Sequence, residues 1–214
     1  MPYIVKEIFY SLQGEGAWTG RPAVFCRFTG CNLWSGRQED RLEAICPFCD
    51  TDFLGWDGPG GGRYQQATSL ATAVAEYWPS DPQSSLGRPY VICTGGEPLL
   101  QLDESLVRAF QQQGFQVGVE TNGTLPPPAG LDWLCVSPKI NAPLLVTQGN
   151  ELKLVYPQTG LDPADYQALA FQHFFLQPRD DGQGGDHIQA AVAYCLAHPQ
   201  WRLSLQTHKV LGIP

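Results

Sequence analysis

Short apolar runs rich in β-branched residues recur along this chain, and amphipathic helical patterns separate several of them. The expected strands cover 23–28, 90–94, 115–120, 133–137, 152–156, 172–176 and 202–206, with another at 3–9. The expected helices cover 69–78, 104–113, 163–170 and 187–197. This alternation predicts an α/β fold with a mostly parallel sheet and helices outside it. A complete eight-fold barrel takes about 250 residues, so a single domain over 1–214 predicts an incomplete, trimmed β/α barrel with a curved sheet.

The composition favours a globular protein that binds a small molecule. A net charge of −8 argues against nucleic acid as a partner, because nucleic-acid binding needs a basic face. The N-terminus lacks a signal-peptide pattern, and no segment has the roughly 20 apolar residues that cross a membrane. Cys26, Cys93, Cys135 and Cys195 lie in apolar patterns and are interpreted as buried free thiols, which favours the reducing cytoplasm.

Polar residues follow the carboxyl ends of several expected strands. Ligands bind at this end of a sheet in parallel α/β architectures, so these segments predict one shared site. Two stretches rich in Pro and Gly, 57–63 and 123–130, are expected to be loops without regular structure. The polar segments are 94–98, 120–123, 137–139, 177–178 and 206–209.

Three further cysteines, Cys31, Cys46 and Cys49, have no fourth cysteine near them. Three thiolates can hold an open zinc site, or an iron–sulfur cluster with one iron free for another ligand. Residues 32–45 separate the first two cysteines, and their second half (38–45) favours a helix. The sequence therefore predicts an extended cluster-binding loop that returns Cys46 to its partners.

Phe48 before the last cysteine, together with the Gly-Gly-Glu-Pro segment at 95–98, resembles the radical S-adenosylmethionine superfamily. The superfamily usually spaces its cysteines C-x3-C-x2-C, so the long first gap departs from that pattern while the second does not. Further motifs lie at 11–16, Arg27, 49–51, 120–123, 137–139 and 206–209. Taken together, these motifs resemble the 7-carboxy-7-deazaguanine synthase family, from about residue 3 to the end of the chain.

The resemblance implies a cofactor set and a reaction. Cys31, Cys46 and Cys49 would hold a [4Fe–4S] cluster that binds S-adenosylmethionine, and Thr51 would contribute to a Mg²⁺ site. Cleavage of S-adenosylmethionine would give a 5′-deoxyadenosyl radical that abstracts hydrogen from C6 of 6-carboxy-5,6,7,8-tetrahydropterin. Ring contraction would then yield 7-carboxy-7-deazaguanine with loss of ammonia, on the route to queuosine. An electron donor such as flavodoxin and a homodimeric state are also implied.

Candidate binding residues follow from these motifs, and no residue stands out as an acid or base. Arg27 presents a planar fork that suits a carboxylate, with a surface ion pair as the alternative. The expected substrate contacts are Leu12, Gln13, Gly14, Glu15, Arg27, Thr94, His208 and Pro214. The expected S-adenosylmethionine contacts are Phe48, Cys49, Asp50, Gly96, Glu120, Asn122, Ser137, Pro138, Lys139, Gln177, Pro178, Arg179 and Asp180.

Two alternatives remain open at the level of sequence. One is an activase of the same superfamily, which makes a glycyl radical on a partner protein. The other is a non-enzymatic zinc-binding module. The activase needs a protein-docking surface in place of a pterin pocket, and the zinc module predicts a colourless protein that leaves S-adenosylmethionine intact.

Overall fold

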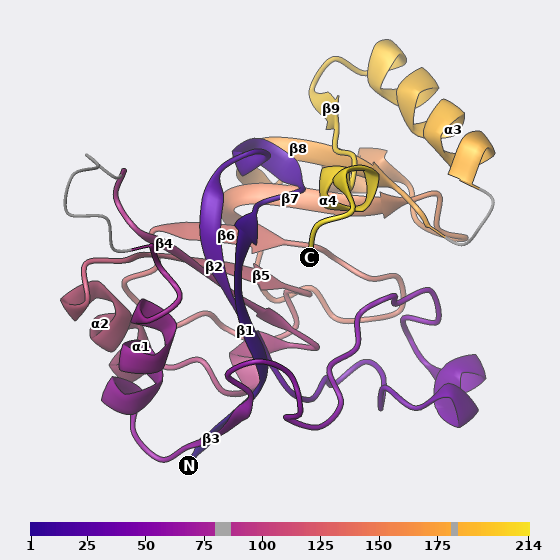
Figure 1. The fold of residues 1–214 in the computed structure, drawn as a ribbon. Coiled ribbons are helices and arrows are strands. Elements are labelled where there is room, and N and C mark those ends of the chain that lie inside the picture. The colour runs from indigo at the N-terminus through magenta and orange to yellow at the C-terminus, as the bar shows by residue number, and fades with distance from the viewer. Residues whose placement is uncertain (80–86, 181–183) are drawn as a thin grey trace.

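One nine-stranded sheet runs through the computed structural model, which describes residues 1–79, 87–180 and 184–214. From β2 to β9 every neighbouring pair is parallel, whereas β1 pairs antiparallel with β2 and β3. β3 and β9 form two separate edges, so the curved sheet stays open (Figure 1). This confirms the mostly parallel sheet of a trimmed barrel. In spatial order the strands are β3 (Gly62–Tyr64), β1 (Tyr3–Leu12), β2 (Pro22–Phe28), β4 (Tyr90–Gly95), β5 (Gln116–Thr121), β6 (Trp133–Val136), β7 (Gln148–Tyr156), β8 (Ala170–Pro178) and β9 (Trp201–Leu203).

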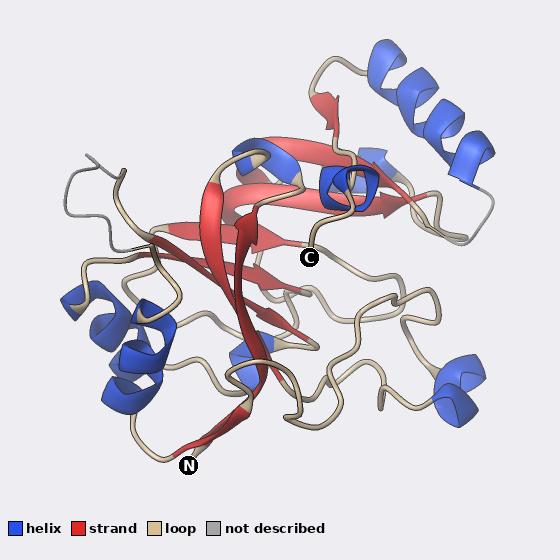
Figure 2. Ribbon diagram, viewed as in Figure 1, coloured by secondary structure: helices blue, strands red, loops and turns tan. Residues whose placement is uncertain are grey.

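Three helices cover the outer face of the sheet, as Figure 2 shows. α1 (Ala67–Ala75) and α2 (Glu104–Gln112) pack on each other and against β1 and β5, while α3 (Gly184–Ala197) packs on β7, β8 and β9. The helix expectations at 69–78, 104–113 and 187–197 are thus confirmed, with ends shifted by a few residues. Asp103 caps α2 as expected, because its carboxylate accepts the Leu106 amide at 2.9 Å.

Two apolar clusters hold the helices to the sheet. The first joins α1 and α2 to β1, β2, β4 and β5, with Phe110 fully buried. The second joins α3 to β6, β7, β8 and β9 around Leu152 and Leu176. Truncating a buried phenylalanine costs about 3–5 kcal/mol, so these clusters, rather than the loops, set the frame on which the site is built.

The expected helix over 163–170 is wrong. Only a short 3-10 helix, η4 (Pro163–Tyr166), forms there, with Asp162 accepting the Ala164 amide at 2.9 Å. β8 already begins at Ala170, because backbone pairing with β7 and burial of Phe171 favour the extended chain.

Two other boundaries differ from expectation. The region 57–63, expected to be irregular, ends in β3, where Gly62 pairs with Val5. Backbone hydrogen bonding to the edge of β1 needs no side-chain pattern, so this strand could not be predicted from local sequence. The strand expected at 202–206 ends at Leu203, and α4 (Thr207–Leu211) follows. Residues 123–130 form a loop, as expected.

Cys26, Cys93 and Cys135 are fully buried in strands, and Cys195 is half-buried on α3. All four are free thiols, in agreement with the sequence-based interpretation. Over the described ranges, none of the helices combines the length and apolarity that crossing a membrane requires.

Candidate active site

A cavity of about 510 Å³ opens over the carboxyl ends of the parallel strands. Parallel pairing brings those ends together: Arg27 on β2 lies opposite Thr94 on β4, for example. Every candidate residue named from the sequence lines this cavity except Pro138, which is buried outside the lining. The candidates therefore gather in one place, as the positions of the polar segments predicted.

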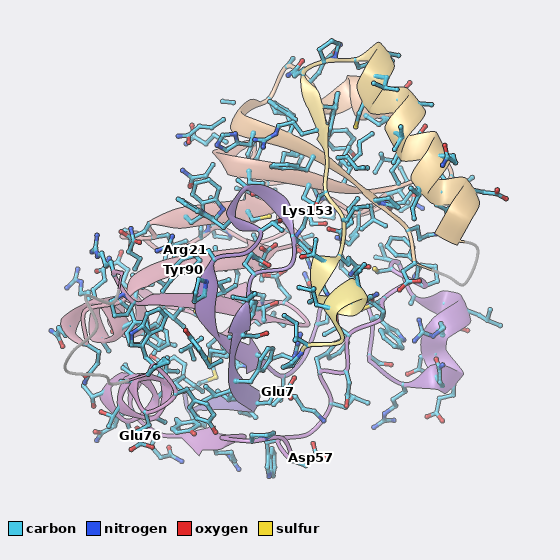
Figure 3. All side chains as sticks on the ribbon, turned by 45° about the horizontal axis from the view of Figure 1, so that its top comes forward. Glu7, Arg21, Asp57, Glu76, Tyr90 and Lys153 are labelled. Carbon is cyan, nitrogen blue, oxygen red and sulfur yellow. The ribbon has the colours of Figure 1, made fainter. Side chains whose placement is uncertain are left out.

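The floor of the cavity is an ion-pair cluster centred on Lys153, which Figure 3 labels on β7. The Lys153 side chain is only 5% exposed, and its Nζ lies 2.5 Å from Glu15 Oε2 and 2.9 Å from Glu120 Oε2. Gln177 and Gln206 each donate to Glu15 Oε1 at 3.0 Å. We call these residues the charged floor; it ties the loop after β1 to β5, β7 and β8.

The charged floor keeps Glu15 ionised. Burial by itself raises the pKa of this carboxyl, but Lys153 and the amide donors outweigh burial and lower the pKa to about 2. Gln13 adds a bond to Glu120 Oε1 at 3.1 Å. Lys153 was not among the sequence-based candidates, because a lysine inside an apolar strand looks like an outward-facing residue until the register is known.

Arg27 lies on the cavity wall, where its Nε donates to Glu7 Oε1 at 2.7 Å. The side chains of Arg27 and Glu7 are 20% and 27% exposed, so the ion pair considered as an alternative does form and is partly buried. Among the residues that the structure describes, the hydrogen bond to Glu7 uses only Nε of Arg27. The two terminal nitrogens of the guanidinium, which can bind a carboxylate bidentately, are therefore available to a ligand.

The C-terminal segment packs against the loop after β1. The Thr207 amide donates to the Gly14 carbonyl at 2.9 Å, and Ser11 Oγ donates to the Pro214 carbonyl at 2.8 Å. A Cβ atom at Gly14 would lie 2.1 Å from Nδ1 of His208, so only glycine leaves room for that ring. Sequence reasoning placed His208 at the end of a strand, whereas α4 positions it.

Lys209, also on α4, links two other segments that line the cavity. Its Nζ lies 2.5 Å from Asp50 Oδ2 and 2.6 Å from Asp180 Oδ2. Asp50 follows the last cysteine and Asp180 follows β8. The pair of contacts fixes the cysteine-bearing loop against the strand ends.

Cys31, Cys46 and Cys49 line one end of the cavity as free thiols. A hydrogen bond from Cys46 lowers the pKa of Cys49 to about 6, and the same bond raises the pKa of Cys46. Lys139, whose Nζ is held by Ser137 Oγ at 2.7 Å, adds positive charge that favours both thiolates. Burial lowers the pKa of Lys139 itself.

Gly95 and Gly96 bring the end of β4 against the loop that starts at Cys31. A Cβ at Gly96 would lie 2.3 Å from the Gly30 carbonyl oxygen and 2.8 Å from the Cys31 Cβ, and Gly95 has φ +142°. Because neither position tolerates a side chain, these glycines set the distance between Cys31 and the sheet.

Glu97 follows this pair and is fully buried. Burial raises the pKa of its carboxyl, although three donors partly offset this effect. Its carboxylate accepts hydrogen bonds from Thr121 Oγ1 at 2.7 Å and from the Asn122 amide at 2.8 Å. These bonds connect the ends of β4 and β5. The Asn122 side chain donates to Asn32 at 3.0 Å and so helps hold the loop that contains the cysteines.

The three thiols lie at one end of the cavity, packed against glycines and near a lysine. Over the described residues, no three His, Cys, Asp or Glu side chains are arranged to hold one metal ion. Each thiolate of an iron–sulfur cluster binds a different iron, so three thiols that line one cavity end are residues of the kind that fit such a group.

Comparisons with known proteins point to one family. The chain is 60% identical over all 214 residues to the 7-carboxy-7-deazaguanine synthase of Bordetella pertussis and 57% identical to that of Caulobacter vibrioides, with full coverage of each. The crystal structure of QueE from Escherichia coli superposes with a TM-score of 0.65 at 26% identity, covering 96% of this chain and 94% of that one. A scan against family models gives no match.

The fold and the thiol-lined cavity define the class: this is an enzyme built on a trimmed barrel of the radical S-adenosylmethionine type, a lyase. The high identity over the full length then fixes the family. The chain belongs to the 7-carboxy-7-deazaguanine synthases. This confirms the expected family, fold and function, and it does not favour the activase or the zinc module.

Proposed function

We propose that the cavity binds S-adenosylmethionine and 6-carboxy-5,6,7,8-tetrahydropterin side by side. The product would be 7-carboxy-7-deazaguanine, with loss of ammonia, on the route to queuosine. The observation that carries the proposal is that the three thiols and the charged floor line the same cavity of about 510 Å³. Pockets of a few hundred to about 1,000 Å³ accommodate small ligands of this kind.

Cys31, Cys46 and Cys49 would hold a [4Fe–4S] cluster at one end of the cavity. With S-adenosylmethionine bound, the cluster would supply the one-electron chemistry that starts the reaction. The chain orients the cofactor and excludes water. Residues around the thiol end would contact S-adenosylmethionine: Phe48, Cys49, Asp50, Gly96, Asn122, Ser137 and Lys139, together with Gln177, Pro178, Arg179 and Asp180 at and after the end of β8.

The pterin would lie over the charged floor. Its aminopyrimidinone edge presents adjacent N–H donors, which match a carboxylate such as that of Glu15 or Glu120. Lys153 pairs with both carboxylates, and Arg27 would take the substrate carboxylate through its terminal nitrogens. Leu12, Gln13, Gly14, Thr94, His208 and Pro214 would complete the pocket around the ring.

Several accompanying features form part of the same proposal. Thr51 lines the cavity and would give a hard oxygen ligand to Mg²⁺, with substrate and water completing the coordination.

The nine-stranded sheet supports treating 1–214 as a single catalytic domain. The free thiols support a cytoplasmic location. A flavodoxin-like reductant and a homodimer are proposed from family membership.

Anaerobic reconstitution tests this function. The purified protein should bind iron and sulfide near 4:4 per chain, turn brown, and with a reductant, S-adenosylmethionine and the carboxylated pterin release the deazaguanine product. Omitting Mg²⁺ should reduce the rate. A brown protein that cleaves S-adenosylmethionine but leaves the pterin intact would contradict the proposed substrate, and a colourless protein would contradict the cluster.

A further inference from the structure

The long segment between the first two cysteines folds into a distinct structure. Residues 38–43 form the 3-10 helix η2 (Gln38–Glu43), the purple coil that stands apart from the sheet in Figure 1. The Ile45 amide donates to the Leu33 carbonyl at 3.1 Å, which closes the segment at its base. We call residues 32–45 the insert.

Trp34 anchors the insert to the protein. Its side chain is only 7% exposed and meets Phe53 edge to face, with ring centroids 5.6 Å apart at 89°. Phe53 is buried and lines the cavity. Trp34 Nε1 donates to the backbone carbonyl of Arg37 at 3.1 Å, so the indole is satisfied on its polar edge as well.

Arg41 connects this anchor to the cysteines. Its guanidinium lies 4.2 Å from the centroid of the Trp34 ring, and its Nε donates to Gln38. Its NH1 donates to the carbonyls of Pro47 and Cys49, at 2.7 Å and 3.0 Å. One planar group therefore bonds two carbonyls of the turn from Cys46 to Cys49, which spans the second and third thiols. Within this turn the Cys49 amide donates to the Cys46 carbonyl at 3.4 Å.

We propose that Arg41 is a positioning residue that fixes the Cys46–Cys49 turn, and that the insert exists to present it. This inference rests on the proposed cluster. The planar guanidinium stacks on an indole and bonds two carbonyls at once, a geometry that lysine does not reproduce. The long gap between Cys31 and Cys46 thus supplies a side chain that holds the turn in position, whereas the usual spacing joins these two cysteines by a short loop.

The test compares Arg41→Ala and Arg41→Lys with Arg37→Ala as the matched control. The Arg37 side chain is 67% exposed and, among the residues that the structure describes, reaches only Glu39, at 3.8 Å. The bond from Trp34 is to the Arg37 backbone, which survives truncation. Loss of a group that orients a metal ligand typically costs about 10- to 100-fold in metal affinity. Iron should therefore leave reconstituted Arg41→Ala at least about 10-fold faster when an iron chelator is added, with Arg41→Lys between it and the wild type.

A second measurement separates this inference from the proposed function. Hydrogen exchange of the amides at 46 and 48–51 is followed in the protein before iron is added, where Arg41→Ala should exchange faster than the wild type and Arg37→Ala should not. Unchanged exchange, or iron loss at the wild-type rate, overturns the role of Arg41. A wild-type protein that takes up no iron overturns the cluster instead, and the exchange result then still decides whether Arg41 braces the turn.

Discussion

The charged floor and the cysteine-bearing loop are built in opposite ways, although they face the same cavity. Glu120 and Lys153 stand on β5 and β7, so strand register places them, and buried ion pairs hold them in position. The cysteines stand on a loop whose one regular element is η2, and single side chains such as Arg41 and Lys209 hold it by bonding backbone or carboxylate groups. A loop held at a few points can change in length without disturbing the sheet, whereas a floor held by register cannot.

The largest effect should come from the loop side. Cys46→Ser removes one of three thiolates, so the cluster should be lost and product formation should fall below detection. Iron and sulfide analysis with a product assay checks this. Cys195→Ser is the control, because that thiol is half-buried on α3, outside the cavity lining; its iron content should equal that of the wild type. Full iron loading of Cys46→Ser would exclude Cys46 as a ligand.

The next effect should come from the floor. Lys153→Met leaves Glu15 and Glu120 facing each other without their cation, and breaking a buried ion pair costs about 3–5 kcal/mol in the free energy of unfolding. Urea unfolding measures it. Arg108→Met removes the exposed pair with Glu104 and should change that free energy by less than about 0.5 kcal/mol. Equal effects from the two substitutions would show that the charged floor is not a stabilising network.

A smaller effect tests the junction between the two regions. Gly14→Ala puts a Cβ into the space of the His208 ring and should displace α4, at a cost of about 1–3 kcal/mol, with a raised KM for the pterin. Gly185→Ala, where nothing lies within 4 Å of the added atom, should be neutral or slightly stabilising. An unchanged KM in Gly14→Ala would remove His208 from the substrate pocket.

A last effect, which depends on pH, concerns Glu151, beside the charged floor. Burial raises the pKa of this carboxyl from 4.5 to about 7, although the Ala17 amide donates to it at 3.0 Å. The folded state therefore holds this proton more tightly than the unfolded state, and its contribution to stability falls as the pH rises from about 4.5 to 7, then stays constant. Glu151→Gln lacks this loss, so its unfolding free energy relative to the wild type should rise over that window. Urea titrations at several pH values measure it, and a flat difference would contradict the raised pKa.

Much of the site could be predicted because its residues follow strand ends in sequence, and parallel pairing brings strand ends together. Thr94 and Glu120 were found for this reason, whereas Arg27, inside an expected strand, was found through the family motifs. Lys153 and Arg41 were not found, since one stands inside an apolar strand and the other in a surface helix. Neither position differs in pattern from an ordinary solvated lysine or arginine; only their contacts distinguish them.

The sequence by itself determined the parallel order of apolar strands, the three thiols and the family, since hydrophobic periodicity and motif spacing are local properties. Tertiary structure alone decided that η4 gives way to β8, that Pro138 is buried outside the cavity, and that Lys153 joins Glu15 to Glu120. These outcomes depend on register and on desolvation between segments far apart along the chain. The free energy of a buried charge is set by the partners that folding brings to it, and no local pattern contains that information.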